Sequence, residues 1–220
     1  MVDSGTPLVA VEEGDDVVTL RLNRPDKLNA LDGELVSGLY ASISDLAEDD
    51  RGVLLTGAGE ATCAGMDLDL VGSGDYPEAH PEVHEELREA QRLLEARTAP
   101  SAIAGFGVLV GAGFSFSLRC DFVVVGEETT LSLPEIRYNI PVAANTRRLA
   151  ELVGPRVAKE IALTGRELDP ERLHAVGLVN DVVPEDEVEE TARELVTEVA
   201  GYNTEHVAEA LEAVSERGGR

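Results

Sequence analysis

The stretch Gly107-Val108-Leu109-Val110-Gly111-Ala112-Gly113 decides how we interpret this chain. Its glycines let the backbone turn tightly and approach a ligand closely. An apolar segment, residues 112–119, follows and is predicted to be a short helix. The first amides of a helix have no intrahelical partner and carry partial positive charge, so they can stabilise an oxyanion. Taken alone, the stretch fits a packing turn better, and it matches neither the phosphate-loop nor the dinucleotide-binding glycine pattern.

Strands and helices alternate outward from this stretch in both directions. Apolar residues alternate over 17–22, which is the period of a strand, and Asp32 is placed to cap a helix over 33–48. The order strand, strand, helix recurs loosely and gives way to helices near the C-terminus. The sequence therefore predicts an α/β fold, a spiral core followed by a helical region. The predicted strands are 8–11, 17–22, 53–56, 102–105, 122–125, 129–133 and 179–183, and the predicted helices are 33–48, 82–97, 112–119, 146–153, 156–163, 170–176, 185–201 and 204–216.

The composition indicates one globular domain with a large negative charge. The chain has 220 residues, 43% of them hydrophobic, with 43 acidic against 18 basic residues and a net charge of −25. Such a field repels phosphates, so we expect neither nucleic acids nor anionic membrane surfaces as partners. Lys27 and Lys159 are the only lysines, and carboxylates are spread along the whole chain. This pattern predicts adaptation to high salt, because the Debye length is about 3 Å at molar salt and the repulsion is then screened.

Residues 98–118 carry no charge, so a membrane span has to be weighed. Pro100 and the glycines and serines of this stretch favour a buried strand, a glycine turn and a buried helix instead. The N-terminus does not resemble a signal peptide, and the two cysteines, Cys63 and Cys120, form no C-x-x-C motif. We therefore expect a cytoplasmic protein without a disulfide framework.

Two further segments contain candidate site residues. Cys63-Ala64-Gly65-Met66-Asp67-Leu68 follows a strand and a glycine loop, and Asp67 fits the cap of a helical turn. Glu135 follows a predicted strand and has apolar neighbours, so burial would raise its pKa toward the range of a general base. Each segment alone fits a structural role better than a functional one. His80 and His84 lack a third ligand, so no metal site is predicted.

Taken together, these segments resemble the enoyl-CoA hydratase/isomerase (crotonase) superfamily over about residues 17–200. The resemblance implies a spiral of ββα units, with a core over 1–183 and a short helical region over 184–220. It implies an acyl-CoA thioester as ligand, a role in fatty acid metabolism, and a homo-trimer or hexamer. No metal and no permanently bound cofactor are implied, since coenzyme A arrives as part of the substrate. The segments that carry the resemblance are 22–31, 63–68, 107–113, 120–121, 133–135, 163–166, 177–180 and 182–184.

The resemblance also assigns roles by motif position. The backbone amides of Met66 and Ala112 would form an oxyanion hole for the enolate of the thioester. Hydratases of the family use two glutamates as catalytic residues. One falls at Glu135 and the other at Ser115, so one acid/base group is present and the other is missing. The residues expected against bound CoA are Lys27, Ala64, Gly65 and Gly111.

A single glutamate favours an isomerase, because double-bond migration needs one carboxylate that removes a proton and returns it two carbons along. Hydration, a lyase reaction, stays open, with Glu135 acting on a water that Ser115 orients. A non-catalytic acyl-CoA-binding homologue and a structural subunit without a CoA site are further alternatives. The departures that motivate them are Ser115, Ala112 in place of the usual glycine, and a C-terminal region shorter than is usual.

Overall fold

The computed structural model describes residues 1–71, 76 and 78–218, with side chains up to residue 214. Within these residues, the centre is a six-stranded sheet in the order β1-β2-β3-β4-β6-β9. β1 and β2 are antiparallel, and the other neighbours in this sheet are parallel. A second, three-stranded sheet has the order β5-β7-β8. The strands are β1 (Val9–Glu13), β2 (Val17–Leu22), β3 (Gly52–Gly57), β4 (Ser101–Gly105), β5 (Val108–Val110), β6 (Phe122–Gly126), β7 (Thr130–Ser132), β8 (Glu167–Leu168) and β9 (Asp181–Val183).

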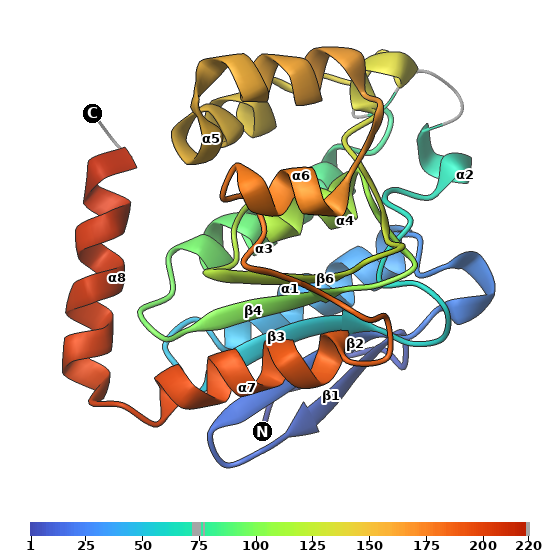
Figure 1. Cartoon of the computed structure of the whole chain (residues 1–220). Helices are drawn as coiled ribbons and strands as arrows, with labels where there is room; N and C mark the ends of the chain where they lie inside the picture. Colours follow the sequence, from blue (N-terminus) through green and yellow to red (C-terminus); the bar gives the residue numbers. More distant parts are fainter. Residues whose placement is uncertain (72–75, 77, 219–220) are drawn as a thin grey trace.

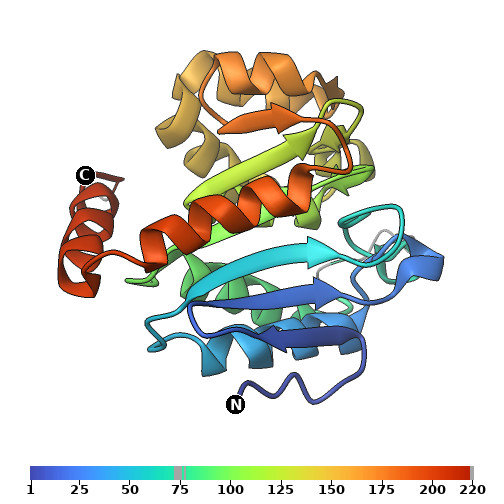
Figure 2. The same ribbon diagram turned by 60° about the horizontal axis from the view of Figure 1, so that its bottom comes forward.

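Helices cover both faces of the larger sheet. α7 runs across the strands on one face, and α1 and α3 lie behind the other (Figures 1 and 2). This arrangement buries the parallel strands on both sides, which is why β3 is buried along its whole length. The helices are α1 (Gly33–Asp45), α2 (Leu68–Val71), α3 (Pro81–Glu95), α4 (Ala112–Ser117), α5 (Ala143–Thr164), α6 (Pro170–Ala175), α7 (Val188–Ala200) and α8 (Thr204–Gly218), with 3-10 turns η1 (Pro25–Lys27) and η2 (Glu135–Tyr138).

Local sequence signals account for most of these elements. β2 has the predicted bounds, and all its residues except Arg21 are buried, because both faces of the sheet are covered. Asp32 caps α1, because its Oδ1 accepts a hydrogen bond from the Leu35 amide at 2.9 Å. One face of α1 and its C-cap residue is apolar and buried, and it consists of Leu35, Leu39, Ile43 and Leu46.

The stretch 107–113 is not a single turn, contrary to the prediction. Val108–Val110 forms β5, which pairs in parallel with β7. Three residues are too few to show the period of a strand, and glycines on both sides look like turn signals. The two helices predicted between 146 and 163 are joined in α5, where non-helical backbone at Gly154 marks the break between them. β8 has two residues and left no pattern to detect.

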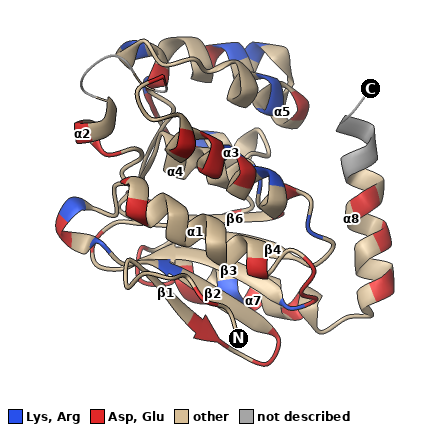
Figure 3. Ribbon diagram, turned by 180° about the vertical axis from the view of Figure 1, so that it is seen from behind, with Lys and Arg blue, Asp and Glu red and all other residues tan. Residues whose placement is uncertain are grey.

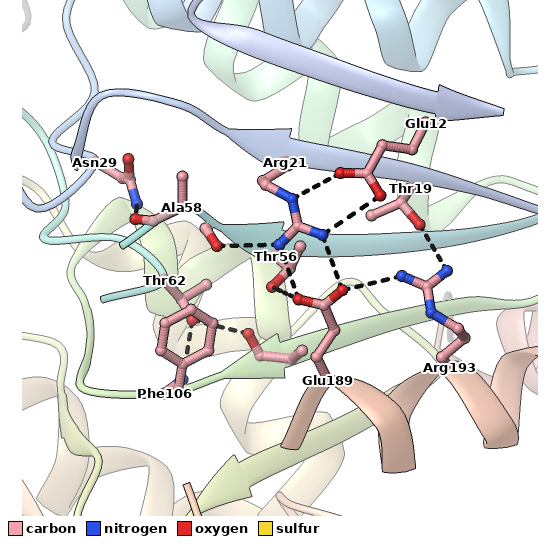
Figure 4. A network of polar contacts seen from close by, with 12 residues as sticks. Glu12, Thr19, Arg21, Asn29, Thr56, Ala58, Thr62, Phe106, Glu189 and Arg193 are labelled. Carbon is pink, nitrogen blue, oxygen red and sulfur yellow. Dashed lines mark hydrogen bonds and ion pairs between the residues drawn. The ribbon is translucent and has the colours of Figure 1, made fainter. Parts of the chain in front are cut away.

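α7 is tied to the sheet by a network of ion pairs (Figure 4). The guanidinium of Arg21 on β2 lies 2.8 Å from Glu189 on α7 and 2.8 Å from Glu12 on β1. Arg193, one turn after Glu189, donates to Thr19 Oγ1 at 2.9 Å. Hydrogen bonds from Arg21 are the largest cause that lowers the pKa of Glu189. The network fixes the orientation of α7 on the sheet, so this helix belongs to the same packed unit as the larger sheet.

α8 stands at the side of the molecule, away from the sheet (Figures 1 and 2). Val214 on this helix is 74% exposed. The division into a core over 1–183 and a helical region over 184–220 stays a prediction. Of the two helices in the second region, α7 packs on the sheet and α8 stands apart from it. None of the helices formed by the described residues is both long and apolar enough to cross a membrane.

Acidic residues recur along α3 and α8 in the view from behind (Figure 3). Because the net charge is −25, screening of the self-repulsion should stabilise the folded chain. We expect the Tm to rise by about 4 °C or more from about 0.1 M to about 1 M KCl, measured by differential scanning calorimetry. Sucrose, which does not screen charge, serves as the control for solute exclusion. A Tm that does not rise with KCl would contradict the proposed adaptation to high salt.

Candidate active site

The first half of the candidate site is the backbone around Met66. This residue forms a parallel bridge with Leu31. The Leu31 amide donates to the Gly65 carbonyl at 2.8 Å, and the Asp67 amide donates to the Leu31 carbonyl at 2.9 Å. Amides alternate in direction along an extended strand, so the Met66 amide points away from Leu31. In the described part of the chain this amide has no hydrogen-bond partner, which leaves it free to bind a ligand.

Asp67 holds this backbone in place. Its Oδ1 accepts from the Asp69 amide at 2.9 Å, which confirms that it caps a helical turn. Its Oδ2 lies 2.6 Å from Nη1 of Arg24, which also donates to the Ala30 carbonyl at 3.0 Å. The bonds from the Asp69 amide and Arg24 lower the pKa of Asp67, so it stays ionised. Arg24 therefore ties the Met66 strand to the segment that precedes Leu31.

The second half of the site is the start of α4. The Gly111 amide donates to the Ser132 carbonyl at 2.9 Å, which joins this turn to β7. The first amide of α4 that bonds back is Ser115, to the Gly111 carbonyl at 2.9 Å. The Ala112 amide comes three residues earlier than Ser115 and therefore has no acceptor within the helix. α4 has six residues, so the local geometry of this amide matters more than a helix dipole.

Gly65 and Gly111 bring the two halves together. A Cβ added at Gly65 would lie 3.0 Å from the Val110 carbonyl oxygen and 3.6 Å from the Ala112 nitrogen. A Cβ added at Gly111 would lie 3.6 Å from the Gly65 Cα and 3.8 Å from Glu135 Oε1. Both residues have positive φ angles, 85° and 55°, which glycine adopts without strain. The two glycines thus allow Met66, Ala112 and Glu135 to approach one another.

Glu135 is the titratable group of this cluster. It is the first residue of η2 and is half-buried, but its Oε2 is shielded from solvent and has no hydrogen-bond partner among the described residues. Burial raises the pKa of Glu135 from 4.5 to about 7. A carboxyl group with such a pKa can both remove and return a proton near neutral pH. The burial that its apolar neighbours predicted is confirmed.

Ser115 lies in α4, and its hydroxyl already donates one hydrogen bond and accepts another. It is 2% exposed. Its Oγ donates to the Ala112 carbonyl at 2.7 Å and accepts from Gln91 Nε2 at 2.7 Å. A neutral hydroxyl that gives its only proton to a carbonyl can accept one more hydrogen bond but cannot donate one to a water.

Gln91 on α3 is a residue of this cluster that the sequence analysis missed. It is 9% exposed and lies on the buried side of α3 with Leu87, Ala90 and Leu94. A polar residue on the apolar stripe of a helix was the signal that could have found it, because a buried amide needs a partner.

Lys27 and Ala64 lie beside the Met66 half of the site. Lys27 is exposed at the end of η1 and makes no ion pair with the described residues. After the Asp69 amide and Arg24, its charge also helps to lower the pKa of Asp67, so it lies close to that carboxylate. The Ala64 amide donates to the Leu28 carbonyl at 2.9 Å, which joins Ala64 to the same segment. The side chain of Lys27 is therefore free to meet an anion near the Met66 backbone.

Comparison with known proteins decides the family. The sequence pattern of the enoyl-CoA hydratase/isomerase family matches residues 12–218. The chain belongs to this family. It is 33% identical over 197 residues to a probable mitochondrial enoyl-CoA hydratase of Dictyostelium discoideum, covering 88% of this chain and 70% of that protein. It is 34% identical over 207 residues to a hydroxycinnamoyl-CoA hydratase-lyase of Pseudomonas fluorescens, covering 89% and 73%.

Solved structures of this enoyl-CoA hydratase/isomerase family show the same fold. The enoyl-CoA hydratase of Bacillus anthracis superposes with a TM-score of 0.87 at 34% identity, covering 94% of this chain and 82% of that one. The predicted α/β crotonase fold is confirmed. The chain is an enzyme of the enoyl-CoA hydratase/isomerase type, and its relatives leave the reaction itself open.

Proposed function

We propose that this enzyme binds an acyl-CoA thioester and moves a proton at the carbon next to the thioester carbonyl. The Met66 and Ala112 amides bind the oxygen of the enolate, and Glu135 is the acid/base. The observation that carries this proposal is the buried Oε2 of Glu135, which has no hydrogen-bond partner among the residues that the structure describes, on a side chain whose Oε1 faces Gly111 beside the Ala112 amide. An Oε2 atom that is shielded from water and has no partner among the described residues costs the fold free energy, and proton transfer gives this carboxyl group a use.

The proposed reaction is migration of a double bond in a 3-enoyl-CoA. Glu135, as the carboxylate, takes a proton from C2, and the electron pair of that C–H bond forms a dienolate whose charge rests on the thioester oxygen. The protonated Glu135 then gives the same proton to C4, and the C2–C3 double bond forms as the thioester carbonyl is restored. No water is consumed and Glu135 returns to its starting state, so one carboxylate is sufficient.

Hydration of a 2-enoyl-CoA is the second candidate, because relatives from Dictyostelium discoideum and Thermus thermophilus are described as enoyl-CoA hydratases. It requires Glu135 to activate a water that Ser115 orients. The hydrogen bonds from Ser115 to Ala112 and from Gln91 to Ser115 leave Ser115 one acceptor site for a water but no proton to donate, so Glu135 alone would have to take the proton from water and supply one to carbon. The third candidate, a non-catalytic acyl-CoA-binding protein, gives no reason for the raised pKa of Glu135.

The proposal extends to the setting of the reaction. Lys27 meets the CoA phosphates, and the backbone at Ala64, Gly65 and Gly111 lies against the thioester end of CoA. Metal and permanently bound cofactor have no part in these steps. Fatty acid metabolism, a homo-trimer or hexamer and a cytoplasmic location stay predictions.

The experiment that tests the function supplies matched 3-enoyl-CoA, 2-enoyl-CoA and saturated acyl-CoA to the wild-type enzyme in deuterated water at high salt. Mass spectrometry and chromatography of the products separate the candidates. Migration without addition of water supports the isomerase. Addition of water supports the hydratase, and binding without turnover of any thioester supports the non-catalytic alternative. Failure to bind any of the thioesters would refute all three.

A further inference from the structure

A chain of two hydrogen bonds joins α3 to the first turn of α4. Gln91 Nε2 donates to Ser115 Oγ at 2.7 Å, and Ser115 Oγ donates to the Ala112 carbonyl at 2.7 Å. Gln91 and Ser115 are 9% and 2% exposed, so water does not compete strongly for these bonds. The chain ends on Ala112, the residue whose amide is half of the proposed oxyanion hole.

Apart from the bond of the Gly111 amide to the Ser132 carbonyl and the burial of its residues, the first turn of α4 has few contacts that fix it. The residue that precedes the helix, Gly111, has no side chain to cap it. The helix is six residues long and so gains little from its own hydrogen bonds. Within α4, Ser117 makes the same type of bond to the Phe114 carbonyl at 2.7 Å, but no side chain from α3 is bonded to Ser117 in the described residues. The bond from Gln91 is therefore a feature of the turn that contains Ala112, not of the whole helix.

We propose that Gln91 is a positioning residue: through Ser115 it fixes the first turn of α4 and so directs the Ala112 amide at the enolate oxygen. The inference rests on the proposed function, because it assigns a purpose to the Ala112 amide. Gln91 touches no reacting atom. Its donor bond polarises the Ser115 hydroxyl and makes it a better donor to the Ala112 carbonyl, which restricts rotation of the turn. A hydrogen-bond donor contributes to catalysis only when it already points to where the charge develops.

The test measures the oxyanion hole without relying on turnover. A β-ketoacyl-CoA is the probe, since its enolate absorbs in the near ultraviolet and its keto form does not. The enolised fraction of the bound probe then reports how well the amides stabilise the oxyanion. Gln91→Met keeps the size of the side chain and removes the donor, and Ser115→Ala removes the hydroxyl. The double variant Gln91→Met/Ser115→Ala completes the cycle.

We expect each single substitution to lower the enolate-to-keto ratio of the bound probe about three- to tenfold, the effect of one misdirected hydrogen bond. The dissociation constant for a saturated acyl-CoA should change less than about twofold, because a ketone-free thioester develops no charge. The double variant should be no worse than Ser115→Ala alone, because Gln91 acts through Ser115. If Gln91→Met does not fold, the enolate-to-keto ratio of Ser115→Ala still tests the proposal.

Ser117→Ala is the matched control. It removes a hydroxyl of the same helix that makes the same bond to a carbonyl, so it should lower the Tm about as much as Ser115→Ala. We expect it to leave the enolate-to-keto ratio unchanged. A ratio that falls equally in Ser117→Ala would show a structural effect and overturn the positioning role.

Two other results would overturn the inference in distinguishable ways. An unchanged ratio in Gln91→Met, with a wild-type enzyme that does enolise the probe, refutes the role of Gln91 and leaves the oxyanion hole standing. Additive losses in the double variant refute the route through Ser115. A wild-type enzyme that binds the probe without enolising it refutes the proposed function, and with it the purpose assigned to Gln91.

Discussion

Glu135→Gln is expected to lower the turnover of enoyl-CoA by about 10²- to 10⁴-fold, the usual contribution of a positioned acid/base. Glutamine keeps the shape of the side chain but can neither remove nor return a proton at neutral pH. Affinity for a saturated acyl-CoA should change little, since the carboxyl group acts on the reacting carbon. Steady-state kinetics on the substrate that the wild-type enzyme converts is the measurement.

The pH dependence gives a second readout of the same residue. The base is the carboxylate, and burial raises the pKa of Glu135 to about 7. Wild-type kcat/KM should therefore rise with pH and level off above about 7, and the residual activity of Glu135→Gln should lack this limb. Glu127→Gln is the control, because Glu127 is exposed in the turn between β6 and β7. Full activity in Glu135→Gln, or the same loss in Glu127→Gln, would contradict the assignment.

The stability of Glu135→Gln should move in the opposite direction to its activity. In the unfolded chain this carboxyl titrates near 4.5, and in the folded chain near 7. The folded state therefore binds the proton more tightly, so the stabilising contribution of Glu135 is complete below about pH 4.5 and is lost as the pH rises through about 7. At pH 8 the variant should be about 1–3 kcal/mol more stable to urea, since it no longer buries an unpaired carboxylate. Near pH 4.5 the two proteins should be equal.

Local sequence signals predicted the burial of Glu135 but not which residues from other elements lie near it. The apolar residues around Leu133-Pro134-Glu135-Ile136 indicated burial, and the side chain is shielded as expected. Glu135 lies near Gly111 because the Gly111 amide bonds to the Ser132 carbonyl, which fixes the start of α4 beside β7. Such non-local pairing leaves no periodic trace in either segment, so only the family resemblance suggested it.

Gln91 shows a different limit. Helix 82–97 was predicted from its apolar face, and Gln91 falls on that face between Leu87 and Leu94. A buried glutamine requires a partner, but the partner, Ser115, lies on another element. The sequence could have marked Gln91 as unusual. It could not have shown which hydroxyl it holds, because that depends on how α3 packs against α4.

Gly65→Ala is expected to reduce turnover by about 100-fold or more, because small displacements of catalytic groups have effects of that size. The added Cβ would lie 3.0 Å from the Val110 carbonyl oxygen and 3.6 Å from the Ala112 nitrogen, one of the two amides that we propose bind the oxyanion. These neighbours are backbone atoms in a braced turn, so the strand carrying Met66 has to move away. The distance between the Met66 and Ala112 amides then increases, and the enolate oxygen can no longer reach both.

Gly177→Ala separates this effect from backbone strain. Gly177 has a φ of 78°, close to the 85° of Gly65, but a Cβ there would meet nothing within 4 Å. Both substitutions force alanine into the left-handed region, at a cost of about 1–2 kcal/mol of stability. Gly177→Ala should therefore lose stability in urea unfolding and keep its kcat/KM, whereas Gly65→Ala should lose both. Equal kcat/KM values in the two variants would mean that the approach of Gly65 to Val110 and Ala112 does not set the geometry of the oxyanion hole.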